Sequence, residues 1–281
     1  MRAEIKEVEE VKEVEEKSVN IAAFFDLDGT LVPLPSMERR FFWTLRSRRL
    51  IGIRNAWSWI TETLRLASRG ISQMQHANKM YLHGVRVDEQ TSLTVPSLYP
   101  EAVERMAWHA ERQHKIVIVS GTLEFLAERV ARALVAELDA CGSASEIQVC
   151  ATRLELDGER WTGRIVGEAI FGGAKARVIQ RMAEEQELDL ERCYAYGDST
   201  NDRWMLEAVG KPAAVNPSND LARIARRNDW PVSWWSEEKD FTQRTQRAQR
   251  RRETPTRQQS DRRDDIDRGT RAMRVSTGHG A

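Results

Sequence analysis

The chain has 281 residues, of which 41% are hydrophobic and 31% are charged, so it can build the core of one large domain or two small ones. Its 43 basic and 43 acidic residues cancel, which removes net charge as an argument for binding to nucleic acid or membranes. No apolar run approaches the about 18 residues that a membrane-spanning helix needs, and the acidic N-terminus does not have the pattern of a secretory signal. The three cysteines do not have the spacing of a metal site. We therefore expect a cytoplasmic protein.

The chain begins with a charged extension, residues 1–18. Seven acidic and four basic residues stand within residues 1–17, and three valines recur among them at every third position. This spacing is typical of a short exposed helix.

Strand signals alternate with helix signals between residues 19 and 236, apart from one long insertion. Short apolar runs predict strands, and between them apolar residues recur at helical spacing. This alternation indicates βαβ units, so we expect an α/β fold, a Rossmann-like parallel sheet flanked by helices. Between residues 147 and 166, alternation around Asp157-Gly158 predicts a β-hairpin. The expected strands are 21–25, 115–119, 193–197 and 213–215, and the expected helices are 100–114, 123–138 and 174–188.

The insertion lies early in the chain. About 90 residues separate Asp28 from Ser120, far more than a crossover connection needs. We expect residues 36–93 to form an inserted α-helical cap on a core made of residues 19–35 and 94–236.

The expected cap is basic and rich in aromatic residues. Residues 36–86 contain ten basic and two acidic residues, a net charge of +8. This charge fits a solvated face, which we favour, or a site for a second anionic group of a substrate or for phospholipid headgroups at a membrane surface. At helical spacing we expect the Trp and Phe residues to form the core of the cap. The apolar and aromatic clusters of the insertion consist of Phe41, Phe42, Trp43, Trp57, Trp59, Ile60, Leu64 and Leu66.

The chain ends with an Arg-rich stretch, residues 237–281. Residues 241–281 carry eleven arginines and five acidic residues but almost no large apolar side chain. They cannot bury enough apolar surface to fold, so we expect a disordered tail. Contact with RNA, an acidic partner or an anionic membrane is the alternative use of such a tail.

Polar residues follow three of the expected strands, and a lysine begins one of the expected helices. In an open α/β sheet, ligands bind at the carboxyl ends of the strands, so we expect these residues to meet at one edge. Any one of them alone is more simply a helix cap, a turn residue or a solvated charge. Their joint occurrence in this order favours a site. The candidates are Asp26, Asp28, Ser120, Gly121, Lys175, Asp198, Asn201 and Asp202.

These residue types suit phosphoryl transfer. Clustered carboxylates repel one another unless they bind a cation or take up protons, and all-oxygen ligands favour Mg²⁺ where phosphate is also bound. One carboxylate can attack phosphorus to give an aspartyl-phosphate, and a second can act as general acid and base. Gly29 lets the backbone approach a phosphate whose oxygens Ser120 and Lys175 can hold.

Four motifs stand out in this set: Asp26-Leu27-Asp28-Gly29-Thr30, Ser120, Lys175 and Gly197-Asp198-Ser199-Thr200-Asn201-Asp202. In order and spacing they resemble the four motifs of the haloacid dehalogenase (HAD) superfamily, over about residues 21–235. The helical insertion and the segments 196–199 and 214–217 are similar to subfamily IB, which includes phosphoserine phosphatase.

The resemblance implies a role for each candidate in catalysis or phosphate binding. Asp26 would be the nucleophile, and Asp28 would be the general acid and base. The phosphoryl group would be bound by Ser120, Gly121 and Lys175.

The resemblance also implies a metal site. Mg²⁺ would lie between Asp26, the backbone carbonyl of Asp28 and Asp198. Asn201 and Asp202 would support these ligands from nearby.

We therefore expect a Mg²⁺-dependent phosphomonoester hydrolase. Its substrate would be a small phosphorylated metabolite, phosphoserine-like or lysophospholipid-like. One alternative is a phosphotransferase or phosphomutase that uses the same aspartyl-phosphate. A second is a non-enzymatic interaction protein with a vestigial site. We expect no nucleic-acid partner and no transmembrane segment, and no feature of the sequence indicates an oligomeric state.

Overall fold

The computed structural model describes residues 20–66, 78–87 and 93–236. The helix expected near the N-terminus and the tail expected over residues 237–281 lie outside these described residues. Within them, no helix has both the length and the apolar character that crossing a membrane requires.

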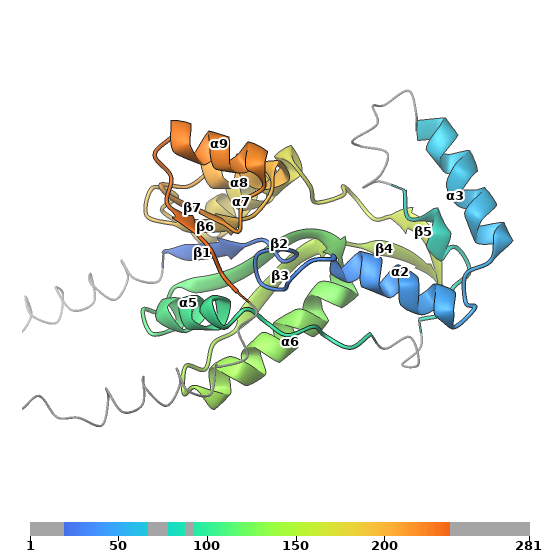
Figure 1. The fold of residues 1–281 in the computed structure, drawn as a ribbon, viewed down its shortest axis with the longest axis horizontal. Helices are drawn as coiled ribbons and strands as arrows, with labels where there is room; N and C mark the ends of the chain where they lie inside the picture. Colours follow the sequence, from blue (N-terminus) through green and yellow to red (C-terminus); the bar gives the residue numbers. More distant parts are fainter. Residues whose placement is uncertain (1–19, 67–77, 88–92, 237–281) are drawn as a thin grey trace, which may run out of the picture. The chain divides into compact units, whose positions relative to one another are not determined.

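Six parallel strands form the main sheet, in the order β3-β2-β1-β6-β7-β8 (Figure 1). All four strands expected from the sequence are present, and β1 lies between β2 and β6. Phe25, at the end of β1, pairs with Ile118 on one side and with Tyr196 on the other. The strands are β1 (Ala22–Phe25), β2 (Lys115–Leu123), β3 (Ile147–Thr152), β6 (Tyr194–Gly197), β7 (Lys211–Val215) and β8 (Val232–Ser233).

Helices cover both faces of this sheet (Figure 1). Because successive side chains of a strand point to opposite faces, Ala23 and Phe25 enter one apolar core and Ala22 and Phe24 enter the other. This arrangement confirms the predicted α/β fold with a covered parallel sheet. The first core includes side chains of α5 (Pro100–Ala110) and α6 (Glu124–Ala140), and the second those of α7 (Gly173–Gln186), α8 (Arg203–Glu207) and α9 (Asn219–Arg227).

The predicted hairpin around Asp157-Gly158 is confirmed, but it is shorter than expected. It consists of β4 (Leu154–Asp157) and β5 (Arg160–Ile165), which pair antiparallel. Residues 147–152 were expected to belong to it and instead pair with β2 as a strand of the main sheet. Apolar residues at alternate positions suit either kind of pairing, so this part of the pattern did not distinguish them.

The described residues of the segment expected to form the cap, 36–66 and 78–87, include two helices and one short 3₁₀ helix. They are α2 (Met37–Ser47), α3 (Ile53–Leu66) and η2 (Met80–Leu82). Helix α2 buries Phe41 against the rings of Phe125 and Trp161. The expectation that Trp43, Trp57 and Trp59 form a cap core is wrong, because all three are exposed in the described structure. Trp57 and Trp59 are exposed because α3 contacts the rest of the chain through hydrogen bonds.

Candidate active site

The loop that follows β1 carries two of the candidate carboxylates. Asp26 is buried, and its backbone N–H donates to the carbonyl of Tyr196 in β6 at 2.9 Å. Gly29 has a φ of +90°, which favours glycine. A Cβ atom on Gly29 would overlap the carboxylate of Asp198. Glycine at this position therefore lets the β1 loop approach the carboxylate that follows β6.

Lys175, in the first turn of α7, lies between two buried carboxylates. Its Nζ is 2.5 Å from Oδ1 of Asp26 and 2.5 Å from Oδ1 of Asp202. Burial of Lys175 disfavours its charged form, but the two carboxylates outweigh this cost and raise the pKa of Lys175. The ammonium group is therefore charged and joins the end of β1 to the segment after β6.

Asp202, in η4 (Thr200–Asp202), holds the loop after β6 in place. Its Oδ2 accepts hydrogen bonds from the backbone N–H groups of Asp198 and Ser199 at 3.2 and 2.9 Å, and from the Ser199 hydroxyl at 2.9 Å. Since its Oδ1 accepts from Lys175, both oxygens of Asp202 are occupied. Asn201 lies beside it, half-buried, and its side chain makes no hydrogen bond to a described residue.

Asp26, Asp198 and Asp202 form an acidic cluster. One carboxylate oxygen from each lies within 4.8 Å of the others. Burial, and then the charge of Asp202, raise the pKa of Asp26 to about 7 in spite of Lys175. Burial, followed by the charges of Asp26 and Asp202, raises the pKa of Asp198 to about 9. A bound cation would therefore stabilise the charged form of these carboxylates, and their all-oxygen donors suit a hard divalent ion.

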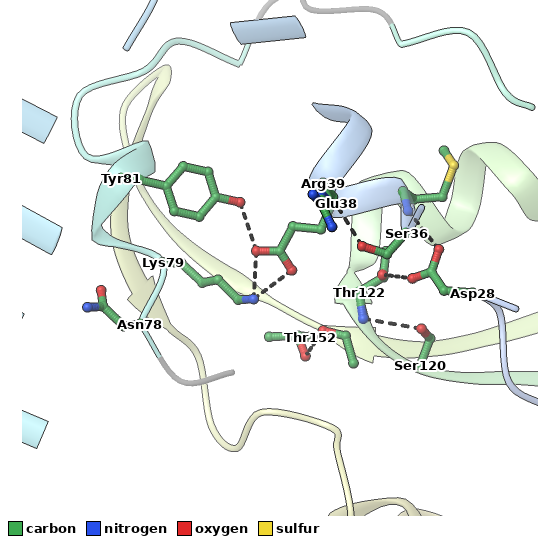
Figure 2. Close-up of polar contacts among 12 residues, drawn as sticks. Asp28, Ser36, Glu38, Arg39, Asn78, Lys79, Tyr81, Ser120, Thr122 and Thr152 are labelled. Carbon is green, nitrogen blue, oxygen red and sulfur yellow. Dashed lines mark hydrogen bonds and ion pairs between the residues drawn. The ribbon is translucent and has the colours of Figure 1, made fainter. Parts of the chain in front are cut away.

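Asp28 is held by a pair of hydrogen-bond donors (Figure 2). Its Oδ1 accepts from the backbone N–H of Met37 at 2.7 Å, and its Oδ2 accepts from the Thr122 hydroxyl at 2.5 Å. Burial raises the pKa of Asp28, and the two hydrogen bonds oppose this rise. Thr122 was not identified as a site residue from the sequence. Its position two residues after Ser120 on a strand could have indicated it, since such residues share a face.

Ser120 and Gly121 lie near the carboxyl end of β2, next to strand β1, which Asp26 follows. Ser120 is buried, and its Oγ accepts the backbone N–H of Thr122 at 3.2 Å. The carbonyl of Gly121 accepts the Thr152 hydroxyl at 3.0 Å. The hydroxyl hydrogen of Ser120 is therefore free to donate to a group at this edge of the sheet.

A second polar cluster lies next to Asp28 and is formed by residues of the segment expected to be the cap (Figure 2). Lys79 Nζ contacts the two carboxylate oxygens of Glu38 at 2.7 and 2.6 Å, and the Tyr81 hydroxyl donates to Glu38 at 2.8 Å. Burial and the charge of Glu38 raise the pKa of Tyr81. A cavity of about 620 Å³ between α2 and α3 is lined by this cluster together with Phe42 and Trp59, among others. No pattern in the sequence indicated this polar cluster, because its residues stand about 40 positions apart.

Comparison with known proteins places this geometry in a family. The family model for haloacid dehalogenase-like hydrolases matches residues 23–207. The inhibition of morphological differentiation protein of Streptomyces azureus is 31% identical over 239 residues, which cover 79% of this chain and 81% of that protein. Phosphoserine phosphatase SerB1 of Mycobacterium tuberculosis is 29% identical over 227 residues, which cover 75% of this chain and 70% of that protein.

A solved structure shares the fold. The crystal structure of a Bordetella pertussis protein of unknown function has a TM-score of 0.58 and 27% sequence identity, and the match covers 76% of this chain and 98% of that one. The predicted family, its relationship to phosphoserine phosphatases and the predicted hydrolase class are confirmed by these comparisons. The chain belongs to the haloacid dehalogenase-like hydrolase family.

Proposed function

We propose that this chain is a Mg²⁺-dependent phosphomonoester hydrolase that works through an aspartyl-phosphate on Asp26. The observation that carries the proposal is the position of the Asp26 carboxylate, which lies at the end of a central strand with one oxygen on Lys175 at 2.5 Å. No hydrogen bond from a described residue reaches its second oxygen. That oxygen can therefore attack a phosphorus atom at the edge of the sheet.

In the first step, the free oxygen of Asp26 forms a bond to phosphorus and the ester P–O bond breaks. The departing alkoxide takes a proton from the carboxyl group of Asp28. The raised pKa of Asp28 supports this role, since a general acid must hold a proton before it can give one. The hydrogen bonds from Met37 and Thr122 fix the direction in which Asp28 points.

In the second step, the carboxylate of Asp28 takes a proton from a water molecule, and the water oxygen attacks phosphorus. The bond between phosphorus and Asp26 breaks, so that inorganic phosphate leaves and Asp28 is protonated again. Lys175 stabilises the carboxylate of Asp26 as it is released. Ser120 and the backbone N–H of Gly121 would bind the remaining phosphoryl oxygens, with Lys175 as the cationic partner.

The donor set fits Mg²⁺. Asp26 and Asp198 would hold the ion with the backbone carbonyl of Asp28, while Asp202 and Asn201 would support these ligands. This division agrees with the hydrogen bonds of Asp202, whose two oxygens are already occupied. When bound, the ion would supply positive charge beside the phosphoryl group and lower the repulsion between the carboxylates.

The substrate class in this proposal is a small phosphorylated metabolite, phosphoserine-like or lysophospholipid-like. A relative named phosphoserine phosphatase supports the first of these. Residues 36–93 would act as a cap on the core formed by residues 19–35 and 94–236. The cavity of about 620 Å³ between α2 and α3 is lined by Ser36 and Glu38, the neighbours of the Met37 that binds Asp28, so part of a leaving group larger than serine would extend towards it.

The test is phosphate release from a panel of phosphomonoesters, with and without Mg²⁺. The panel should contain phosphoserine, glycerol phosphates, sugar phosphates, lysophosphatidic acid and a chromogenic aryl phosphate. Asp26→Asn should lower turnover at least about 10⁴-fold, because it removes the nucleophile. The matched control is Asp220→Asn, which changes an exposed aspartate of α9 and should leave turnover unchanged.

Two outcomes would contradict the proposal. Release of phosphate by Asp26→Asn at the wild-type rate would exclude the aspartyl-phosphate. Transfer of phosphate to added alcohols, with no hydrolysis in their absence, would assign the chain to the phosphotransferases instead.

A further inference from the structure

Helix α3 has an unusual orientation, because polar side chains attach it to the rest of the chain. Asn55 donates to the backbone carbonyls of Tyr81 and His83 at 3.1 and 2.8 Å. Asn78, from the segment before η2, donates to the carbonyl of Trp59 and to the Thr63 hydroxyl, both at 2.8 Å. The inward side of α3 therefore makes specific hydrogen bonds rather than an apolar contact.

The opposite side of α3 presents an apolar row that we call the α3 stripe: Ile53, Trp57, Ile60 and Leu64. These positions are spaced by four, three and four residues, which places them on one face of a helix. Their exposed fractions are 79%, 64%, 41% and 70%, so all four are exposed to solvent in the described structure. A row of four large apolar side chains is more than the scattered exposure that soluble surfaces ordinarily carry.

Arginines are frequent in α3 and in the chain just before it. Within residues 36–66 and 78–87 the only acidic residues are Glu38 and Glu62. Glu38 is paired with Lys79, and Glu62 lies 3.6 Å from Arg65. Between residues 46 and 54, four exposed arginines form no ion pair with a described residue. They are Arg46, Arg48, Arg49 and Arg54.

We propose that the α3 stripe and these four arginines bind the surface of an anionic lipid bilayer. The apolar side chains would enter the boundary between headgroups and acyl chains, and the arginines would bind lipid phosphates. Charge favours this occupant over a second copy of the chain, because two copies packed stripe to stripe would bring eight unpaired arginines together. The proposal does not depend on the catalytic reaction.

The test uses the full chain and two kinds of vesicle, pure phosphatidylcholine and phosphatidylcholine mixed with phosphatidylglycerol. Cosedimentation should show binding to the mixed vesicles that weakens with added salt. The double variant Trp57→Gln/Ile60→Gln should bind at least about tenfold more weakly, because two apolar side chains no longer leave water. Arg48→Gln and Arg49→Gln should each weaken binding about fivefold.

The matched control is Trp234→Gln, which replaces a tryptophan that is 71% exposed and lies outside the cap. This variant should bind like the wild-type chain. Glutamine keeps the helix propensity of α3, and circular dichroism should verify that every variant is folded.

Three results would overturn the proposal. Equal binding by the wild-type chain and the Trp57→Gln/Ile60→Gln variant would assign membrane contact to another part of the chain, such as its Arg-rich end. Absence of binding to mixed vesicles would exclude a lipid partner. A dimer in sedimentation velocity that the double variant abolishes would assign the α3 stripe to a second copy.

Discussion

The sheet edge and α3 both reverse the usual distribution of polar and apolar residues. At the sheet edge, Asp26, Lys175 and Asp202 are buried although all three are ionisable. On α3, Trp57 and Leu64 are exposed although both are large and apolar. Such reversals cost free energy in each case, since charges lose hydration and apolar surface stays in water.

The two regions differ in how this cost is compensated. The buried charges compensate one another within the chain, because Lys175 touches both carboxylates and Asp202 accepts three further hydrogen bonds. The α3 stripe has no such partner among the described residues. We call the sheet edge the closed region, because its buried charges have partners within the chain, and α3 the open region, because its exposed apolar side chains have none among the described residues. A closed region indicates a preformed site for chemistry, whereas an open region indicates a surface that binds another molecule.

Removal of the Lys175 ammonium group from the closed region should have the largest effect on stability. Lys175→Met leaves Asp26 and Asp202 buried without a positive partner, and we expect a loss of about 3–5 kcal/mol in the free energy of unfolding. Urea denaturation without divalent ions would measure it. Part of the loss should return in Lys175→Met/Asp202→Asn, which removes one of the stranded charges.

An exposed ion pair provides the control for this variant. Arg223→Met breaks the contact with Asp220 on the surface of α9, and we expect a change below about 1 kcal/mol. Equal losses for Lys175→Met and Arg223→Met would mean that the buried charges do not compensate one another as described.

A buried histidine in the last turn of α5, His109, should make stability depend on pH. His109 lies 2.8 Å from Nδ1 of His114 and 2.9 Å from the Tyr196 hydroxyl. Burial, with the charges of His114, Arg105 and Arg112 as smaller causes, lowers the pKa of His109 to about 3. Between pH 6.5 and 3 the unfolded chain therefore binds a proton at His109 that the folded chain does not.

This difference in bound protons sets the direction in which stability changes with pH. The contribution of His109 is fully present above pH 6.5 and is lost as the pH falls, at up to about 1.4 kcal/mol per pH unit. His109→Gln should therefore lose less stability than the wild-type chain between pH 6.5 and 4. Parallel curves for His109→Gln and the wild-type chain would show that His109 is not held neutral in the fold.

The sequence was sufficient to predict the core of the fold because its strands are apolar on both faces. The run at residues 115–119 is β-branched and apolar throughout, which is typical of a strand covered by helices on both faces, and residues 21–25 form a similar apolar run. Strand β3 was harder to assign, since alternate apolar residues fit a hairpin as well as the edge of a parallel sheet. The cap was misjudged at Trp57 and Trp59, because helical spacing reveals an apolar face but not which way it points.

The candidate site was predictable to the extent that it depends on strand ends. Asp26 and Asp198 follow neighbouring strands, and the topology brings them together whatever the loops do. Contacts made by backbone groups or across long insertions have no such signal. The N–H of Met37 that binds Asp28 and the ion pair between Lys79 and Glu38 are of this kind.

The smallest effect on stability is expected on α3, in the open region. Trp57→Gln/Ile60→Gln should change the free energy of unfolding by no more than about 0.5 kcal/mol in the absence of vesicles, because these side chains contribute little to packing within the chain. Phe41→Ala on α2 provides the contrast, since Phe41 is fully buried and its loss should cost about 3–5 kcal/mol. Urea denaturation of both variants measures the difference. A loss for the α3 variant as large as that for Phe41→Ala would mean that the stripe packs against another part of this chain. The exposed apolar side chains of α3 would then have their partners within the chain, as the buried charges at the sheet edge do.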